Sequence, residues 1–286
     1  MRVVTFDSAA DYLVVAERLL AADPVSNQLP LALPRAVRDA PALYPGGLCC
    51  LAAIDDEGAC VAFAVQTAPW PMQLSVAPPE GATALGRHAA TTQAELVGVM
   101  GPRPAAQAFA SAFGEVSGAT AEVDQEMGVY VLTAVAELPL AAGSVRVAEH
   151  SDAALLAGWM GAFHAEAVPN DPAPGPDIGR NMAAAGRTWL WLDVGGTPVC
   201  LAHNAREVDG FHSVGPVYTP PEHRGRGFAT ALVSTLSSYL LARGRGCTLF
   251  ANLADPTSNA VYERIGYRRV GAALKLSFLR SSRPGR

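Results

Sequence analysis

The feature that most limits the fold is a predicted strand that ends in two prolines and leads through a glycine-rich loop into a long helix. The run, residues 217–229, reads Val-Tyr-Thr-Pro-Pro-Glu-His-Arg-Gly-Arg-Gly-Phe-Ala, and apolar residues at helical spacing continue to Ala242. The two prolines end the strand because proline cannot donate to a β-ladder. The first amides of a helix lack internal partners and carry partial positive charge. The pattern therefore predicts an anion site, most naturally for phosphate, where this helix begins.

Two common phosphate-binding motifs do not fit this run. A P-loop needs a lysine in the loop, and the one lysine of the chain is Lys275. The dinucleotide fingerprint needs glycine at position 230, which is Thr230. From the glycines alone, a turn without any ligand stays open as an alternative.

A wider pattern gives the loop an interpretation. Arg224-x-x-Gly227-x-Ala229 after a strand resembles the Gln/Arg-x-x-Gly-x-Gly/Ala signature of the GNAT superfamily of N-acetyltransferases. A later segment, Asn259–Tyr267, resembles the second landmark of that superfamily, an Asn and a Tyr on a short helix before a Gly-aromatic pair. The full run looks most similar to the branch that includes the glycine N-acyltransferase-like proteins. The resemblance covers about half of the chain, and it indicates fold and cofactor but not substrate.

The resemblance implies a set of site residues that bind coenzyme A, with acetyl-CoA as the acyl donor and no metal. The loop and helix start would hold the pyrophosphate, the strand end would contact the pantetheine, and Tyr262 would stand near the thioester sulfur as proton donor to the leaving thiolate. The expected cofactor contacts are Val217, Tyr218, Thr219, Arg224, Gly225, Arg226, Gly227, Phe228, Ala229, Thr230, Asn252, Asn259 and Tyr262.

The general base that would accept the proton of the amine is less clear from the sequence. His212, in the long predicted strand, is our candidate because a histidine titrates near neutral pH. Asp255, Glu166 and Asp171 are further candidates, and Asn252 could position a water. A chain of water molecules acting as the base also stays open.

The order of predicted elements indicates two similar halves. Val76-Ala-Pro-Pro-Glu80 repeats as Tyr218-Thr-Pro-Pro-Glu222, and each copy follows a strand. The break at Glu137–Gly143 suggests a boundary, which gives a domain over 1–139 and another over 140–286. We therefore expect an α/β chain of two tandem GNAT-like domains, each a mixed, mostly antiparallel sheet flanked by helices.

The first half lacks the cofactor signature. Aligning the two Pro-Pro-Glu segments sets Ala82 opposite Arg224 and Leu85 opposite Gly227. No pair like Asn259 and Tyr262 follows. We interpret the first half as a degenerate domain that has lost coenzyme A.

Composition excludes several other classes of protein. The net charge of −5 disfavours nucleic acid as a partner. The five cysteines form no Cys-x-x-Cys pair, so we expect reduced thiols in the cytoplasm. No apolar stretch reaches the ~18 residues of a membrane span. The oligomeric state, monomer or homodimer, is left open.

These observations lead to a functional expectation. The leading hypothesis is an acyl-CoA-dependent N-acyltransferase acting on a primary amine of a small molecule or amino-acid-like acceptor. The alternative is a non-catalytic acyl-CoA sensor that uses the same cradle. The sequence identifies neither the acceptor nor the length of the acyl chain.

Overall fold

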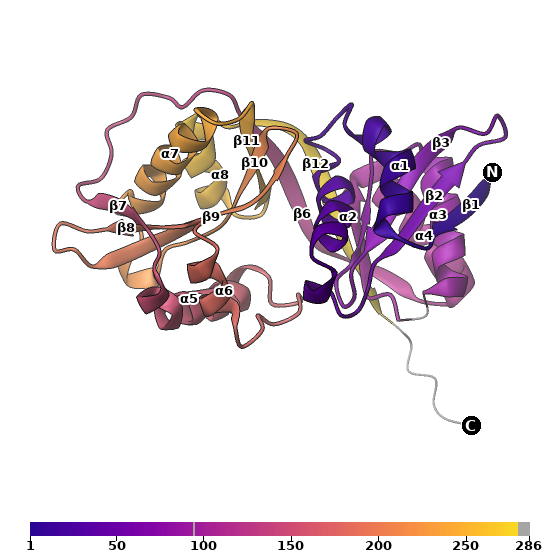
Figure 1. Ribbon diagram of the computed structural model, residues 1–286, viewed down its shortest axis with the longest axis horizontal. Helices are drawn as coiled ribbons and strands as arrows, with labels where there is room; N and C mark the ends of the chain where they lie inside the picture. Colours follow the sequence, from indigo (N-terminus) through magenta and orange to yellow (C-terminus); the bar gives the residue numbers. More distant parts are fainter. Residues whose placement is uncertain (94, 280–286) are drawn as a thin grey trace. The chain divides into compact units, whose positions relative to one another are not determined.

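The computed structural model describes residues 1–93 and 95–279, which form two compact units (Figure 1). Of the described residues, unit 1 comprises those of Met1–Val129, Asn252–Ala254 and Gly271–Leu279, and unit 2 comprises Tyr130–Ala251 and Asp255–Val270. The units do not follow a single cut in the chain, because β6 and β12 each contribute residues to both. The segment from Gly271 to Leu279, which we expected in the second domain, pairs antiparallel with β5 and so packs in unit 1.

The first half of the chain supplies most of unit 1. Its elements are β1 (Arg2–Phe6), α1 (Ala9–Leu20), α2 (Gln28–Asp39), β2 (Cys49–Ile54), β3 (Cys60–Gln66), β4 (Met72–Leu74), α3 (Pro79–Thr92), β5 (Gly98–Pro102), α4 (Arg103–Ser117) and β6 (Thr120–Leu132). The strand order in this unit is β1-β2-β3-β4-β5-β12-β6.

The second half supplies most of unit 2. Its elements are β7 (Ser144–Val147), α5 (Ala153–Ala167), α6 (Ile178–Ala184), β8 (Thr188–Leu192), β9 (Pro198–Val208), β10 (Phe211–Tyr218), α7 (Phe228–Leu241), β11 (Gly246–Asn252), α8 (Pro256–Ile265) and β12 (Arg268–Leu279). The strand order in this unit is β6-β11-β10-β9-β8-β7.

The pairing of strands within each unit is mixed and mostly antiparallel, as predicted, although all the strands belong to one 12-stranded sheet. The parallel pairs are β4 with β5 and β10 with β11. Antiparallel pairing joins β1 to β2, β2 to β3, β3 to β4, β7 to β8, β8 to β9 and β9 to β10. A parallel pair needs a crossover connection, and α3 and α7 are the helices that make it.

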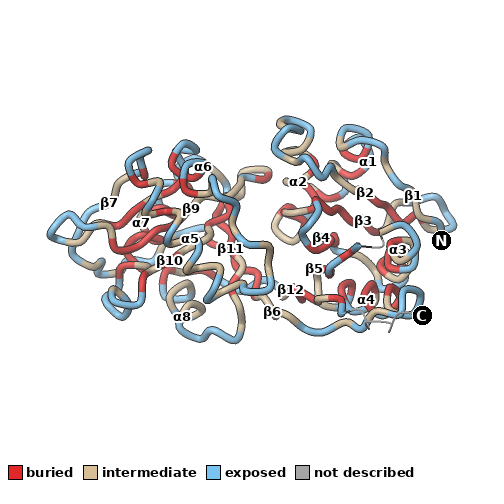
Figure 2. Tube along the Cα trace, turned by 90° about the horizontal axis from the view of Figure 1, so that it is seen from below, coloured by how far each residue is buried: buried red, intermediate tan, exposed pale blue. Residues whose placement is uncertain are grey.

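Helices cover both faces of each sheet, and buried residues lie between the layers (Figure 2). In unit 1, α3 and α4 pack on the sheet through Leu85 and Phe109, both fully buried. On the other face of this sheet, Tyr12 of α1 meets Phe63 of β3 edge to face, at 5.8 Å between ring centroids. In unit 2, α7 and α8 pack on one face, and α5 and α6 pack on the other around Leu201.

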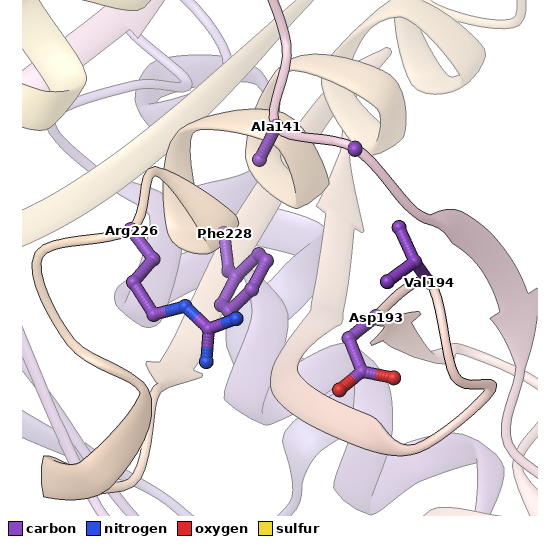
Figure 3. A pocket seen from close by; sticks show the side chains of 6 residues that line it. Ala141, Asp193, Val194, Arg226 and Phe228 are labelled. Carbon is purple, nitrogen blue, oxygen red and sulfur yellow. The ribbon is translucent and has the colours of Figure 1, made fainter.

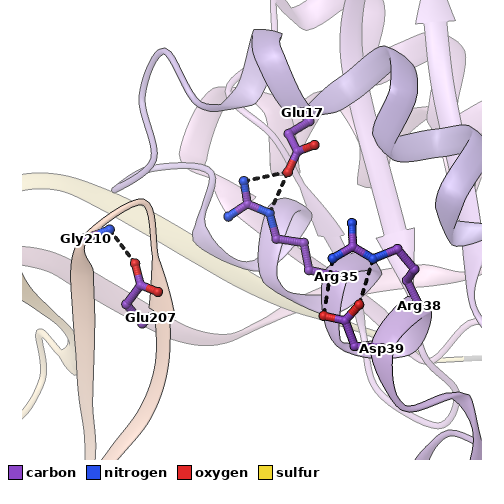
Figure 4. A network of polar contacts seen from close by, with 6 residues as sticks. All are labelled: Glu17, Arg35, Arg38, Asp39, Glu207 and Gly210. Atoms are coloured by element: carbon purple, nitrogen blue, oxygen red, sulfur yellow. Dashed lines mark hydrogen bonds and ion pairs between the residues drawn. The ribbon is translucent and has the colours of Figure 1, made fainter.

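Surface contacts fasten neighbouring elements within each unit (Figure 4). In unit 1, Arg35 of α2 forms an ion pair with Glu17 of α1 at 2.8 Å. In unit 2, the side chain of Glu207 accepts a hydrogen bond from the amide of Gly210, which closes the β9–β10 hairpin. The hairpin reverses tightly because Asp209 and Gly210 both have positive φ.

Candidate functional site

The strand β10 separates from its parallel neighbour β11 before it reaches the proline pair. The register between them pairs Phe211 with Gly246, His212 with Cys247 and Ser213 with Thr248. Within the described residues no further pair joins these two strands, although β10 continues to Tyr218. Between Ser213 and Val217 the β10 strand is also bulged against β9. The two central strands of unit 2 therefore part toward the end where the loop begins.

The loop after β10 leads into a helix start that no side chain caps. The backbone at Gly225 and Gly227 is left-handed, with φ of +73° and +79°. Gly227 is the N-cap of α7 and makes no side-chain cap hydrogen bond, so the first-turn amides of this helix lack partners within it. A Cβ at Gly225 would meet nothing within 4 Å, and one at Gly227 would meet only Ala141 Cβ at 3.8 Å. The backbone here is open to close approach by a phosphate.

A pocket of about 220 Å³ adjoins this helix start (Figure 3). Arg226 and Phe228 face it from the loop and α7, and Asp193 and Val194 face it from the β8–β9 turn. The guanidinium of Arg226 lies 4.8 Å from the centre of the Phe228 ring. Ala141 and Ala142 complete the lining. No sequence pattern indicated Asp193, Val194 or the two alanines, because they come from a hairpin turn and a linker.

Tyr262 projects from α8 into an apolar setting near Cys200. Burial raises the pKa of the Tyr262 phenol well above its ordinary value, and the nearby Cys200 and Asp255 raise it further. Its hydroxyl hydrogen-bonds to none of the residues that the structure describes. The hydroxyl of Thr219 donates to the Cys200 sulfur at 3.2 Å. Burial raises the pKa of the Cys200 thiol to about 12, so Cys200 stays a neutral thiol.

Glu166 joins the end of α5 to the strand end and the loop. Its Oε1 accepts from the Tyr218 hydroxyl at 3.0 Å, and its Oε2 accepts from Arg224 Nη2 at 2.5 Å. Arg224 Nε also donates to the carbonyl of Thr219 at 2.9 Å. The hydrogen bond from Arg224 is the largest cause that holds the pKa of Glu166 below its usual range. Glu166 is therefore an ionised, paired carboxylate at neutral pH.

Asn259 and Asp255 are occupied in holding the start of α8. Asn259 Oδ1 accepts from the Tyr130 hydroxyl at 2.7 Å, and its amide nitrogen donates to the Asp255 carbonyl at 2.6 Å. The Asp255 carboxylate caps α8 by accepting from the amides of Thr257 and Ser258. Contact between Asn259 and a pantetheine arm stays a prediction, and Asp255 has the role of a cap.

The structure does not bring two of the predicted site residues, His212 and Asn252, to the loop before α7. His212 is the second residue of β10, at the opposite end from Val217, roughly 16 Å away along an extended strand. Its Nδ1 lies 3.5 Å from Asn204 Nδ2, and its ring packs against Gly244. Asn252 ends β11, where its side chain accepts from the Ala254 amide, and by its contacts it belongs to unit 1. The strand was predicted from Phe211, as the structure has it, but the bulge between Ser213 and Val217 was not predicted.

Unit 1 differs from unit 2 at the end of β4, the strand that corresponds to β10. β4 pairs with β5 through Gln73 and Met100, and a Cβ on Gly101 would lie 2.7 Å from Leu74 Cβ. The strands are thus in close contact one residue before β4 ends. The helix α3 begins directly at Pro79, so Ala82 and Leu85 are fully buried helix residues and no glycine loop forms.

Comparisons with known proteins agree with this arrangement. Residues 201–275 match the family model described as FR47-like protein. An acetyltransferase of the GNAT family from Colwellia psychrerythraea is 14% identical, with 98% of this chain and 100% of that chain covered and a TM-score of 0.58. The chain has the fold of tandem GNAT proteins. A GCN5-related N-acetyltransferase from Sphaerobacter thermophilus is 18% identical over 99% and 97% of the two chains, with a TM-score of 0.60.

A tandem GNAT protein from the clavulanic acid biosynthesis pathway is also similar, at 15% identity over 97% and 98% of the chains, with a TM-score of 0.57. A comparison with curated proteins finds no match. At these identities the solved structures show that the GNAT fold extends over both halves, and the matched family model covers the strands and loop of the candidate site.

Two further searches concern the described part of the chain. Among residues 1–93 and 95–279, no group of three or more His, Cys, Asp or Glu side chains is arranged to hold a metal ion. None of the helices in that part is both long and apolar enough to cross a bilayer.

Proposed function

We propose that this chain is an acyl-CoA-dependent N-acyltransferase that transfers an acetyl group to a primary amine of a small molecule. The observation that carries the proposal is the parting of β10 from β11 just before an uncapped helix start with two left-handed glycines. A phosphate can meet the free amides of α7, while the gap between the strands leaves backbone groups without a partner strand.

Tyr262 supplies the chemistry in this proposal. Coenzyme A, when bound, carries the acyl group as a thioester and departs as a thiolate. Because its pKa is raised, the Tyr262 phenol stays protonated at neutral pH and can donate its proton to a developing thiolate. Its hydroxyl has no partner to give up among the described residues, which favours a catalytic role over that of a sensor.

No protein side chain is assigned as the general base. Glu166 is paired with Arg224, Asp255 caps α8, and His212 lies at the far end of β10. We propose that water accepts the proton of the amine. The cytoplasmic location and the monomeric or dimeric state stay predictions.

Binding of acetyl-CoA tests the cradle directly. Thermal unfolding with acetyl-CoA at ~100 times its dissociation constant should show ~2.7 kcal/mol of added stability, which is several degrees. Gly225→Asp and Gly225→Asn form a matched pair, since both residues tolerate left-handed backbone and the site is open. The aspartate should weaken binding about tenfold more than the asparagine at low salt, because its charge repels phosphate.

Turnover is then measured as thiol release from acetyl-CoA with a panel of small amines. Absence of any thermal shift in the folded wild-type protein at millimolar acetyl-CoA would contradict the proposal. Equal binding by the Asp and Asn variants would place the phosphate elsewhere.

A further inference from the structure

The side chain of Arg224 does not extend freely from the loop in which it lies. It turns back to donate to the Thr219 carbonyl at 2.9 Å and to the Glu166 carboxylate at 2.5 Å. Its guanidinium also lies 5.8 Å from the centre of the Tyr218 ring. The signature arginine thus bridges the end of β10 and the end of α5.

This bridge fastens the loop before α7 through side-chain hydrogen bonds. Over residues 220–227, all of them described, Arg224 makes the only side-chain hydrogen bonds. The 3-10 turn Pro221–His223 precedes it, and two left-handed glycines follow it. Glycines widen the conformations open to a loop, so a fixed side chain next to them lowers the entropy that binding must remove.

Glu166 is held from two directions and can therefore hold Arg224 in turn. The Tyr218 hydroxyl donates to one carboxylate oxygen and Arg224 to the other. Tyr218 is 6% exposed, so its position is fixed by packing against α5 residues such as Trp159, 6.5 Å away between ring centroids. The end of the strand is thereby linked to the loop through one carboxylate.

We propose that Glu166 is a positioning residue for the acyl-donor site: it holds Arg224 in place and so keeps the loop before α7 in the conformation that receives the donor. The identity of the ligand that the loop receives rests on the proposed function. The contact by which Glu166 holds Arg224 does not rest on it. Since Glu166 lies near the end of α5, changes at this helix are transmitted to the loop through Arg224.

The hold on Arg224 is tested without any ligand. Trypsin must take an arginine side chain into its pocket, so a bound Arg224 resists cleavage of the Arg224–Gly225 bond. In Glu166→Ala this bond should be cut at least about fivefold faster, as followed by mass spectrometry. Asp177→Ala is the matched control, because it removes the carboxylate that pairs with the exposed Arg180 in the same unit. It should leave cleavage after Arg224 unchanged.

The effect on the donor site is tested by titrating acetyl-CoA in the presence of 0.1 M and ~0.5 M salt. High salt screens the positive charge of Arg224 that Glu166 no longer neutralises in the variant, so that loss of positioning remains. Glu166→Ala should then bind acetyl-CoA about threefold to tenfold more weakly, with an unchanged unfolding midpoint. Glu166→Gln, whose carbonyl can still accept, should recover part of the affinity, and Tyr218→Phe should lose part of it.

Each outcome decides the matter. Unchanged cleavage after Arg224 in Glu166→Ala, or equal affinity at ~0.5 M salt, overturns the positioning role. If the wild-type protein itself binds no acetyl-CoA, the proposed function fails, and faster cleavage in Glu166→Ala still supports the hold on the loop.

Discussion

Tyr262 and Tyr267 offer a matched pair of substitutions with opposite expected results. Their rings meet edge to face, with centroids 6.0 Å apart, on either side of the α8 terminus. The Tyr267 hydroxyl is hydrogen-bonded to Ser237 Oγ at 2.9 Å in the core, where Tyr267 and Ser237 are each at most 2% exposed. The Tyr262 hydroxyl makes no hydrogen bond within the described part of the chain. One hydroxyl thus stabilises the fold and the other is available for chemistry.

The magnitudes follow from this difference. Tyr262→Phe removes no hydrogen bond, so the free energy of unfolding should change by less than about 0.5 kcal/mol. Turnover should fall at least ~100-fold, the lower end for general acid catalysis, while affinity for acetyl-CoA is kept. Tyr267→Phe leaves Ser237 without its partner and should cost about 1–3 kcal/mol of stability with little effect on kcat.

On the same preparations, thermal unfolding measures stability, calorimetric titration measures affinity for acetyl-CoA, and thiol release measures turnover. Wild-type turnover by Tyr262→Phe would refute the proton-donor role. A loss of more than about 1 kcal/mol of stability in Tyr262→Phe would show that its hydroxyl is a structural group.

Three further predictions concern stability and reactivity. Lys275→Met removes the ammonium group from a buried ion pair, in which Lys275 Nζ lies 2.5 Å from Asp124 Oδ2, and should cost about 3–5 kcal/mol in denaturant unfolding, whereas Lys275→Met with Asp124→Leu should recover most of it. Cys200, with its pKa at about 12, should resist iodoacetamide at pH 8 until the protein unfolds, as peptide mass spectrometry would show. Asp152→Asn breaks the bonds to Arg146 and should cost about 2 kcal/mol at pH 7. The pKa of Asp152 is lower in the folded protein than in the unfolded chain, chiefly because of its hydrogen bonds with Arg146. The stability that Asp152 contributes is therefore present above its unfolded-state pKa. The cost of Asp152→Asn should vanish in thermal melts as the pH falls through the folded-state pKa.

Local signals predicted much of the fold. Ser8 caps α1 as its hydroxyl suggests, and Gly266 ends α8 in a left-handed turn. The long alternating strand β10 and the helix after Gly227 also agree. Each of these depends on residues within one turn or one strand, where sequence carries the full physical cause.

Signals that depend on distant residues were missed. From their apolar runs alone, Tyr267–Val270 and Leu274–Leu279 suggest two separate strands. They lie along one strand, β12 (Arg268–Leu279), because its second part pairs with β5 of unit 1. The run Tyr130–Val135 likewise suggests a short strand, but Tyr130–Leu132 is the end of the longer β6. Asp152 directly precedes α5, where an aspartate suggests a cap, but its carboxylate accepts from Arg146 and from the Glu149 amide and makes no hydrogen bond that caps α5.

The candidate site shows the same division between local signals and contacts with distant residues. The loop and Tyr262 could be predicted because each belongs to a short sequence motif. The bond from Glu166 to Arg224 crosses from α5 to the loop, so no pattern in the chain announces it. His212 was chosen for its chemistry alone, and position along β10 is what separates it from the loop.

The contrast between the two units leads to a last prediction, a stoichiometry of one acetyl-CoA per chain. In unit 2 the recorded pairing of β10 with β11 ends at Ser213, and an open glycine loop follows the strand. In unit 1 the space is closed, because Leu74 packs against Gly101 and α3 starts directly at Pro79. Opening it would require moving backbone as well as removing a side chain, which a buried core opposes. Calorimetric titration should therefore give one site, abolished together with turnover by changes in the loop before α7. A second site that survives Gly225→Asp would mean that unit 1 binds the donor by a surface other than the gap between its central strands.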